Sequence, residues 1–396
     1  MSAKIVCQNY FQKSLTIHRH RANILFNTSW SLTQHAHLTL TSLGRRMDTN
    51  AYAKHKIKAV NRLLGNPKLL KECEQIYKEL LTPMLEILPT LFINVDWSGC
   101  CTKETHVLRA VLQYDGRGIP LYNQVFPQSQ LGSTSAHQQF LINLKKMLPS
   151  NSHVIIVTDA GFATPWFAAV QKMGWDFVGR VNHQMNVQLD EDDEENWVDM
   201  REFADKATST PKLFGTGKLG KKSSTPVEAS VYLYKQVKKN RKGMSCFPDV
   251  NKQYSRTHNF PWVIVTSLCP NQYKARQIIN IYKKRMQIEQ NFRDDKNCRY
   301  GLAWRLSGTT SINRLTILLL IATIATFFLW WIGLTAQQQG LHLRFQANSI
   351  KHRRVLSLIY LGKEICRNDT YFPNPIVFYE TALFFRDSYL RTILCL

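Results

Sequence analysis

Apolar positions divide the chain into a helical beginning and a strand-rich middle. Over residues 1–75 they recur at helical spacing, and residues 38–65 predict two helices joined by a turn at residues 47–50. Thr49 or Asn50 is the expected cap of the second helix, because a short polar side chain can accept a backbone hydrogen bond there.

The second of these helices has one apolar and one basic side. Its apolar positions are expected to face a core: Ala53, Ile57, Val60 and Leu64. Its basic positions project elsewhere: Lys54, Lys56, Lys58 and Arg62. This pattern is compatible with a helix that contacts DNA phosphates or a groove, and equally with an ordinary bundle helix.

Short apolar runs separated by polar or glycine-containing turns predict strands from residue 91 onward. The predicted strands are residues 91–96, 107–114, 119–126, 154–157 and 177–181, and helices are predicted at 136–148 and 165–173. The order β-β-β-α-β-α-β is that of the ribonuclease H-like fold, in which the first and fourth strands lie side by side. Asp96 and Asp159 are each expected to end one of those two strands.

Residues 182–260 interrupt this pattern and predict a β-rich insertion with a strand at 227–237. The insertion carries an acidic run at residues 190–195, expected to be a solvated loop. It also carries a basic loop that could contact DNA, formed by Lys235, Lys238, Lys239, Arg241 and Lys242. Residues 262–266 then return to strand character.

A polar stripe distinguishes residues 282–296, which read as one helix. At about 100° per residue, Tyr282, Arg285, Glu289 and Lys296 share a face about 60° wide. Ile281, Ile288 and Phe292 form an adjacent apolar strip that can pack on a core. Taken alone, the stripe is compatible with a solvated ladder of charges.

Residues 315–334 contain no charged side chain and are long enough to cross a membrane. No second such run accompanies them, and they follow the polar helix closely. A fully buried core helix is therefore the preferred interpretation, with a membrane span as the alternative.

The charge of the chain indicates a polyanionic partner. Lys and Arg number 51 against 28 Asp and Glu, a net charge of +23, and residues 1–70 contain eleven Lys and Arg with Asp48 as the only acid. Nucleic acid is favoured over an anionic membrane surface. Nine cysteines without a C-x-x-C pair suggest a reducing cytosol without structural zinc, and the chain opens without a secretion signal.

Two aspartates at adjacent strand ends and a glutamate on a helix could converge on two divalent cations. Carboxylate oxygens suit Mg²⁺, and two ions roughly 4 Å apart can assist an in-line phosphoryl displacement. An Asp after a strand is more often a turn former, so the hypothesis depends on Asp96, Asp159 and Glu289 together.

The spacing Tyr282-x2-Arg285-x3-Glu289-x6-Lys296 resembles the YREK signature of bacterial DDE transposases of the insertion-sequence-four family. Four fixed residues at fixed spacing would arise by chance in about 0.002 of chains this long. Asp96 within Val-Asp-Trp-Ser and Asp159 within Thr-Asp-Ala-Gly-Phe are similar to the two aspartate motifs of that family. The resemblance extends to about Leu361, and the role of residues 371–396 stays open.

The resemblance implies a catalytic, metal-binding triad of Asp96, Asp159 and Glu289 with two Mg²⁺ ions, for which Mn²⁺ can substitute. It implies cut-and-paste transposition through hairpin-ended DNA, with Tyr282, Arg285 and Lys296 on phosphates near the transposon end. Trp262 would stack on a base flipped out beside the scissile bond, or else be a core tryptophan, and Arg180 would touch DNA near the metals.

The expected partners are the double-stranded transposon ends and target DNA, bound by a homodimer in the cytoplasm without a membrane. Lys54, Lys58 and Arg62 are the expected DNA contacts of a helical end-binding domain at residues 1–75. A ribonuclease H-like core is expected at 88–181 and 261–335, around the insertion at 182–260, followed by a helical C-terminal region at 336–396 that could mediate dimerisation. The alternative is a catalytically inactive DNA-binding repressor or decayed transposase on the same scaffold.

Overall fold

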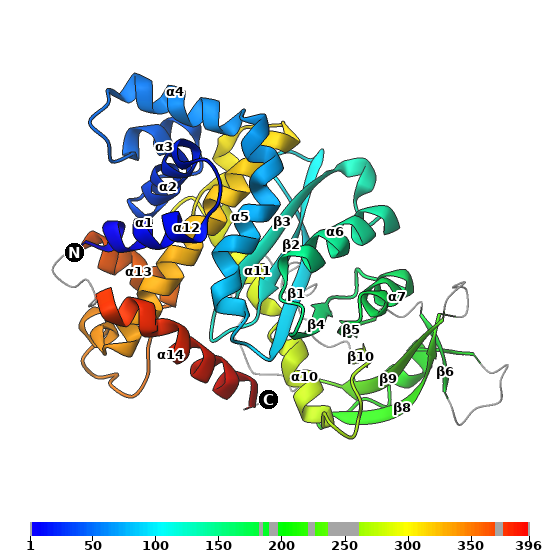
Figure 1. Cartoon of the computed structure of the whole chain (residues 1–396). Coiled ribbons are helices and arrows are strands. Elements are labelled where there is room, and N and C mark those ends of the chain that lie inside the picture. The colour runs from blue at the N-terminus through cyan, green and yellow to red at the C-terminus, as the bar shows by residue number, and fades with distance from the viewer. Residues whose placement is uncertain are drawn as a thin grey trace, which may run out of the picture. The chain divides into compact units, whose positions relative to one another are not determined.

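The computed structural model describes residues 2–181, 185–189, 197–220, 226–236, 261–368 and 375–394. The chain forms two compact units (Figure 1). The first unit comprises residues 1–131, 142–153 and 286–395, and the second comprises residues 132–141 and 154–285 together with Leu396. Helix α6 (Thr134–Met147) has residues in both.

Five helices open the first unit, as the apolar spacing predicts. They are α1 (Ala3–Ser14), α2 (Arg19–Thr33), α3 (Leu40–Arg46), α4 (Ala53–Leu64) and α5 (Pro67–Leu85). The turn between α3 and α4 is confirmed, but the predicted cap is wrong, because α4 starts after Tyr52, whose side chain makes no capping bond. Ala53 is exposed rather than buried because it is the first residue of the helix, whereas Val60, Leu63 and Leu64 are buried.

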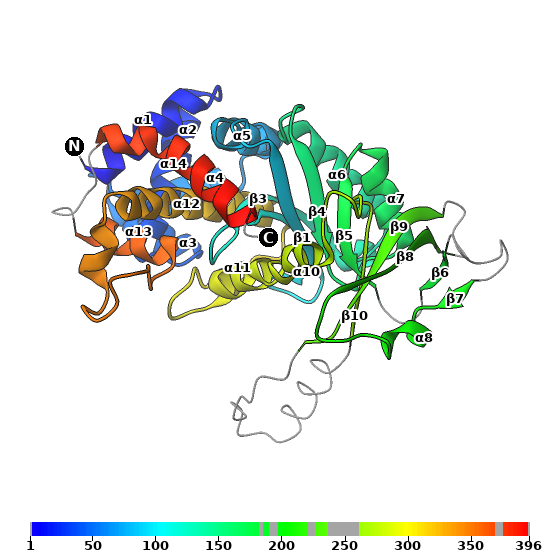
Figure 2. The ribbon, with the colours of Figure 1, turned by 90° about the horizontal axis from the view of Figure 1, so that it is seen from below.

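Helix α12 (Ile312–Gln338) is the central element of the first unit and contacts α2, α5, β3, α13 and α14 (Figure 2). It is long and apolar enough to cross a membrane, yet the whole apolar window is buried inside the protein. Gly333 of α12 faces the backbone of α13 (Leu358–Arg367) so closely that a Cβ there would lie 2.0 Å from the Leu358 carbonyl oxygen. The prediction of a buried core helix is confirmed.

Three antiparallel strands complete this unit in the order β3-β2-β1. They are β1 (Thr90–Gly99), β2 (Thr105–Leu112) and β3 (Ile119–Pro127), followed by η1 (Gln128–Gln130). Asp96 does not end its strand, contrary to the sequence-based expectation. Strand β1 stays paired with β2 as far as Gly99, opposite His106, so Asp96 lies inside the strand and pairs with Arg109.

The C-terminal segment also belongs to the core of the first unit. It contains α11 (Met286–Lys296), η2 (Trp304–Ser307), η3 (Leu341–Phe345), α13 and α14 (Pro375–Leu394). The Tyr389 hydroxyl of α14 donates to the Thr90 carbonyl at 3.0 Å and accepts from the Phe92 N–H at 3.1 Å. The indole N–H of Trp331 in α12 donates to the Phe378 carbonyl at 3.0 Å. Helix α14 therefore forms hydrogen bonds with both β1 and the central helix α12.

The second unit holds a mixed sheet. Strands β4 (His153–Thr158) and β5 (Asp176–Arg180) are parallel, and the order continues antiparallel through β10 (Trp262–Thr266), β9 (Val227–Tyr234), β8 (Lys212–Leu219), β6 (Asn186–Leu189) and β7 (Val198–Asp199). Helices α7 (Thr164–Lys172) and α10 (Ala275–Lys283) pack on β5, and α8 (Arg201–Ala204) follows β7.

Strands β6 to β9 lie in the segment predicted to be a β-rich insertion, although β9 ends at Tyr234, earlier than predicted. The acidic run at 190–195 and the basic residues Lys238, Lys239, Arg241 and Lys242 lie outside the described residues. Along the chain the elements follow the order β1-β2-β3-α6-β4-α7-β5, as expected from the sequence.

Candidate active site

The segment expected to be one polar helix is in fact two. Helix α10 ends at Lys283, α11 begins at Met286, and the Arg285 N–H donates to the Tyr282 carbonyl at 2.9 Å in a tight turn. The prediction of a single 60° stripe is therefore wrong: Tyr282 and Arg285 belong to the second unit, and Glu289 and Lys296 to the first. The turn is hard to predict because Lys284 keeps near-helical dihedrals (φ −70°, ψ −10°) and neither Pro nor Gly marks it.

In the first unit, α11 packs against β1 and carries Glu289 over the strand of Asp96. The Lys296 ammonium donates to the Ser98 hydroxyl at 2.6 Å. Ser98 and Asp96 are two residues apart in a strand, so both point to the face that α11 covers. Glu289 precedes Lys296 by seven residues, about two helical turns, and therefore lies on the same side of α11.

Two buried amides fix the rotation of α11 about its axis. Gln287 forms hydrogen bonds with both the N–H and the carbonyl of Tyr114, and Asn291 donates to the Gly118 carbonyl at 2.9 Å. Both partners lie in or beside the connection from β2 to β3. Because Gln287 and Asn291 are one turn apart on a different side from Glu289, these bonds orient Glu289 away from that connection.

A polar row crosses the strands on the same face. Asp96 is directly opposite Arg109, and Arg109 is directly opposite Asn123. Arg109 is 1% exposed; its Nη1 lies 2.6 Å from Asp295 Oδ2 on α11, and its Nε donates to Asn123 Oδ1 at 2.5 Å. Its guanidinium also lies 4.5 Å from the centre of the Phe292 ring. The Arg109–Asp295 pair joins β2, the strand next to that of Asp96, to α11, the helix that carries Glu289.

Sequence reasoning missed Arg109 and Asp295. The available signal was an arginine inside the otherwise apolar run of β2, since a charge in a buried strand needs a partner. Burial raises the pKa of Asp295, and the neighbouring Arg109 opposes that rise. Burial, together with Arg305, lowers the pKa of Lys296.

In the second unit, Asp159 immediately follows β4, as predicted. Its Oδ1 accepts from the Gly161 N–H at 2.9 Å, so this carboxylate also shapes the turn. The parallel pairing of Thr158 with Gly179 brings the next residues of the two strands, Asp159 and Arg180, to the same edge of the sheet.

Tyr282 lies among the charged groups of this unit and is buried. Burial raises its pKa, Arg285 and Arg180 lower it, and Asp159 raises it further. The guanidinium carbon of Arg285 lies 5.9 Å from the centre of the Tyr282 ring.

Trp262 is half-buried at the start of β10, and its indole is flanked by two tyrosines. The ring centres of Tyr282 and Tyr234 lie 5.0 and 5.6 Å from that of Trp262, both edge-on. The Lys283 ammonium lies 4.5 Å from the centre of the Tyr234 ring. An accessible indole with cations nearby can stack on a base, and its partial exposure argues against a purely core role.

The predicted DNA contacts of α4 are on the surface of the first unit. Lys54, Lys58 and Arg62 are exposed, whereas Lys56 turns inward and donates to the Met47 carbonyl at 2.9 Å. Among the described residues, no three His, Cys, Asp or Glu side chains are grouped so that they could bind a metal ion. Asp96 and Glu289 belong to the first unit, and Asp159 belongs to the second.

Comparison with known proteins identifies the chain at the level of family. A search of curated proteins found no match. The family model described as Transposase DDE domain matches residues 93–326, more than half of the chain and a range that contains Asp96, Asp159 and Glu289. The chain belongs to the DDE transposase domain family.

Proposed function

We propose that the protein is a cut-and-paste DNA transposase of the insertion-sequence-four group, similar to the transposase of the tetracycline-resistance composite transposon. Family membership makes it a transposase that acts on DNA. The single observation that carries the finer proposal is the matched domain, which contains the two aspartate motifs and the Tyr282-to-Lys296 signature at the family spacing. We infer that both units contribute residues to the reaction.

The metal site of this proposal consists of Asp96, Asp159 and Glu289. The donors fit hard divalent cations, because all three are carboxylates and all are partly accessible to solvent. Bound Mg²⁺, or Mn²⁺ in its place, would activate a water or 3′-hydroxyl and stabilise the leaving oxygen. We infer hydrolysis at the transposon ends, hairpin formation and strand transfer as the reactions.

The remaining side chains bind and orient DNA. Lys296 reaches the active face of β1 through Ser98, so its ammonium can donate to a phosphate beside the carboxylates. Tyr282 and Arg285 supply a phenol and a guanidinium beside Asp159, and Arg180 adds a second guanidinium. Trp262 would hold a flipped base by stacking.

The exposed basic side of α4 fits binding to transposon ends, and pairing two ends fits a homodimer acting in the cytoplasm. No described feature favours the inactive DNA-binding repressor over the enzyme. The two proposals differ in one measurable respect, because only the enzyme cuts DNA when a divalent metal is present.

An end-cleavage assay tests the proposal. Wild type should nick transposon ends with Mg²⁺, whereas Glu289→Gln should bind ends with similar affinity and fail to nick, because the substitution removes a ligand charge at nearly constant shape. Glu86→Gln, at an exposed glutamate of the same unit, is the control and should cut normally. Binding without nicking by the wild type would favour the repressor instead.

A further inference from the structure

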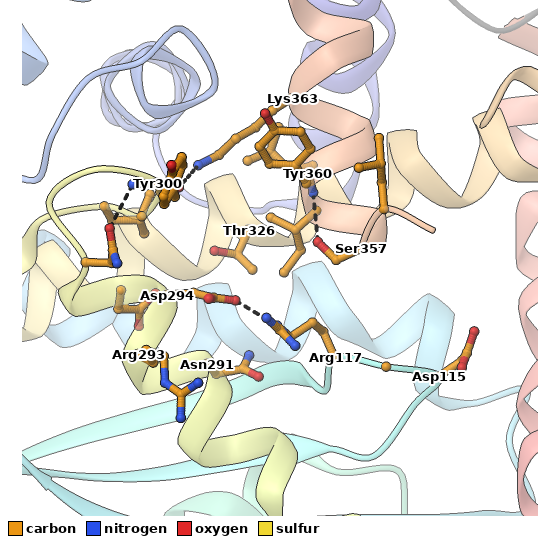
Figure 3. A pocket seen from close by; sticks show the side chains of 18 of the residues that line it. Asp115, Arg117, Asn291, Arg293, Asp294, Tyr300, Thr326, Ser357, Tyr360 and Lys363 are labelled. Carbon is orange, nitrogen blue, oxygen red and sulfur yellow. Dashed lines mark hydrogen bonds and ion pairs between the residues drawn. The ribbon is translucent and has the colours of Figure 1, made fainter. Parts of the chain in front are cut away.

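A cavity of about 660 Å³ lies in the first unit between α11, α12 and α13 (Figure 3). Its size is within the roughly 300–1,000 Å³ range of small-molecule sites. It is lined from α11 by Asn291 and Asp294, from the β2–β3 connection by Arg117, and from α12 by Thr326. The proposed roles of the active-site residues do not use this cavity.

Asn291 lines the cavity and has a buried side-chain oxygen without a hydrogen-bond partner. The residue is 3% exposed, its Nδ2 is committed to the Gly118 carbonyl, and its Oδ1 has no hydrogen-bond partner. The oxygen itself is buried, so a ligand N–H reaches it only after a small shift of the groups that line the cavity. A ligand carrying an N–H group would supply the missing donor.

Lys363 presents an uncommitted cation. The three carboxylates that line the cavity are already paired: Asp294 with Arg117 at 2.9 Å, Asp115 with Arg354 at 2.9 Å, and Asp295 with Arg109 at 2.6 Å. Lys363 donates only to the Tyr300 carbonyl, at 3.1 Å, and forms no ion pair among the described residues. Burial lowers the pKa of Lys363, which means that the surroundings disfavour its ammonium form. An anion bound in the cavity would favour the ammonium form and would itself be stabilised by it.

Two tyrosines provide an aromatic border. Tyr300 is 61% exposed and Tyr360 is 36% exposed, and in Figure 3 both lie beside Lys363 at the rim. An apolar ligand would leave Asn291 and Lys363 unsatisfied, and inorganic phosphate would use neither Asn291 Oδ1 nor the rings. A ligand needs a flat ring, an N–H donor and an anionic group together.

We propose that this cavity binds one nucleotide unit. The base would lie against Tyr360 and Tyr300 with an N–H on Asn291 Oδ1, and the phosphate would lie against Lys363. The nucleotide could come from an unpaired position of a bound DNA strand or from a free mononucleotide. The DNA source rests on the proposed function. Because Asn291 and Glu289 share α11, an occupied cavity would be coupled to the helix of the proposed active site.

Titration calorimetry of the full-length protein with dAMP tests the binding site. We expect Tyr360→Ala and Lys363→Met each to weaken dAMP binding about tenfold, a loss typical of removing one stacking ring or one phosphate contact. Deoxyribose 5-phosphate, which lacks the base, should bind at least about tenfold more weakly than dAMP. Tyr379→Ala and Lys351→Met, at exposed positions outside the cavity, should change nothing. No dAMP binding by the wild type, or wild-type affinity for dAMP in both cavity variants, would overturn the proposal.

Photocrosslinking distinguishes the two sources. DNA ends carrying single 5-iodouracils should label Tyr300 or Tyr360 if the nucleotide belongs to DNA, and dAMP should displace that label. Saturable dAMP binding without any label assigns the cavity to a free nucleotide. End cleavage is measured in parallel. Cleavage without nucleotide binding refutes the cavity proposal alone, and nucleotide binding without cleavage refutes the proposed catalytic function alone.

Discussion

Asp295→Asn should loosen the helix that carries Glu289. The substitution keeps the shape of the side chain but removes the charge that faces Arg109 at 2.6 Å. Arg109 cannot respond by losing its proton, because a guanidinium stays protonated in proteins. It would remain 1% exposed and charged, with Asn123 Oδ1 and the Phe292 ring as its remaining partners.

Removing one partner of a buried ion pair costs about 3–5 kcal/mol. We expect Asp295→Asn to destabilise this contact by about 3 kcal/mol, the lower end of that range. The Phe292 ring still stabilises the desolvated Arg109 cation, and asparagine can still accept a hydrogen bond. At about 1.4 kcal/mol per tenfold, amide hydrogens in α11 that exchange by opening of this contact should then exchange about 100-fold faster. Hydrogen exchange read by mass spectrometry on peptides covering residues 286–296 measures this directly.

Two further variants calibrate the result. Asp387→Asn removes an exposed carboxylate 3.3 Å from Arg386 and should cost less than about 0.5 kcal/mol. Arg109→Met combined with Asp295→Leu removes both charges and should exchange more slowly than Asp295→Asn, because no unpaired charge remains buried. Two results would refute a role for the pair in holding α11. One is an unchanged exchange rate in Asp295→Asn, and the other is faster exchange in the double variant than in Asp295→Asn.

Three other perturbations follow from the structure. Replacing Lys54 and Lys58 by Glu should weaken end binding and lower the slope of log affinity against log salt by about 2, measured by salt-dependent anisotropy; an unchanged slope would move end recognition elsewhere. Trp262→Ala should slow cleavage of intact ends about tenfold while Trp262→Phe retains most activity, and equal rates for both would leave no stacking role. Burial lowers the pKa of His137 from 6.5 to about 4. Between these two pH values the unfolded chain binds a proton at this histidine that the folded chain excludes. The second unit should therefore be most stable above pH 6.5, and its free energy of unfolding should fall by at most about 3 kcal/mol as the pH falls towards 4. His137→Phe should flatten this dependence in urea titrations, and an equally steep dependence in that variant would assign it to other groups.

Local periodicity was sufficient for most of the fold. The strands around Asp96 and Asp159, the helices α6 and α7, and the buried α12 follow from apolar spacing, because each of those elements buries one continuous face or its whole surface. The end of β1 could not be predicted in the same way. Three residues beyond Asp96 remain paired through backbone hydrogen bonds that leave no hydrophobic signature.

The sequence was sufficient to choose the residues of the candidate site, but not to predict the turns and contacts that position them. The break at Arg285 depends on one tightened backbone turn, which neither composition nor spacing records. The Arg109–Asp295 pair depends on a contact between residues distant in sequence, and the orphaned acceptor of Asn291 depends on which of its two amide atoms the Gly118 carbonyl engages. Such features arise from packing between elements and were therefore invisible in the chain alone.

Iron-mediated cleavage of the protein backbone tests the central claim most directly. Fe²⁺ bound in place of Mg²⁺ reduces added hydrogen peroxide to hydroxide and a hydroxyl radical while it is oxidised to Fe³⁺, and the radical cuts the chain beside the ligands. A shared centre predicts cuts near Asp96, Asp159 and Glu289 in the same sample, all competed away by Mg²⁺ and all lost together in Asp159→Asn. Cuts near only one of the three segments, or cuts near Asp96 and Glu289 that persist in Asp159→Asn, would contradict a metal centre built from both units.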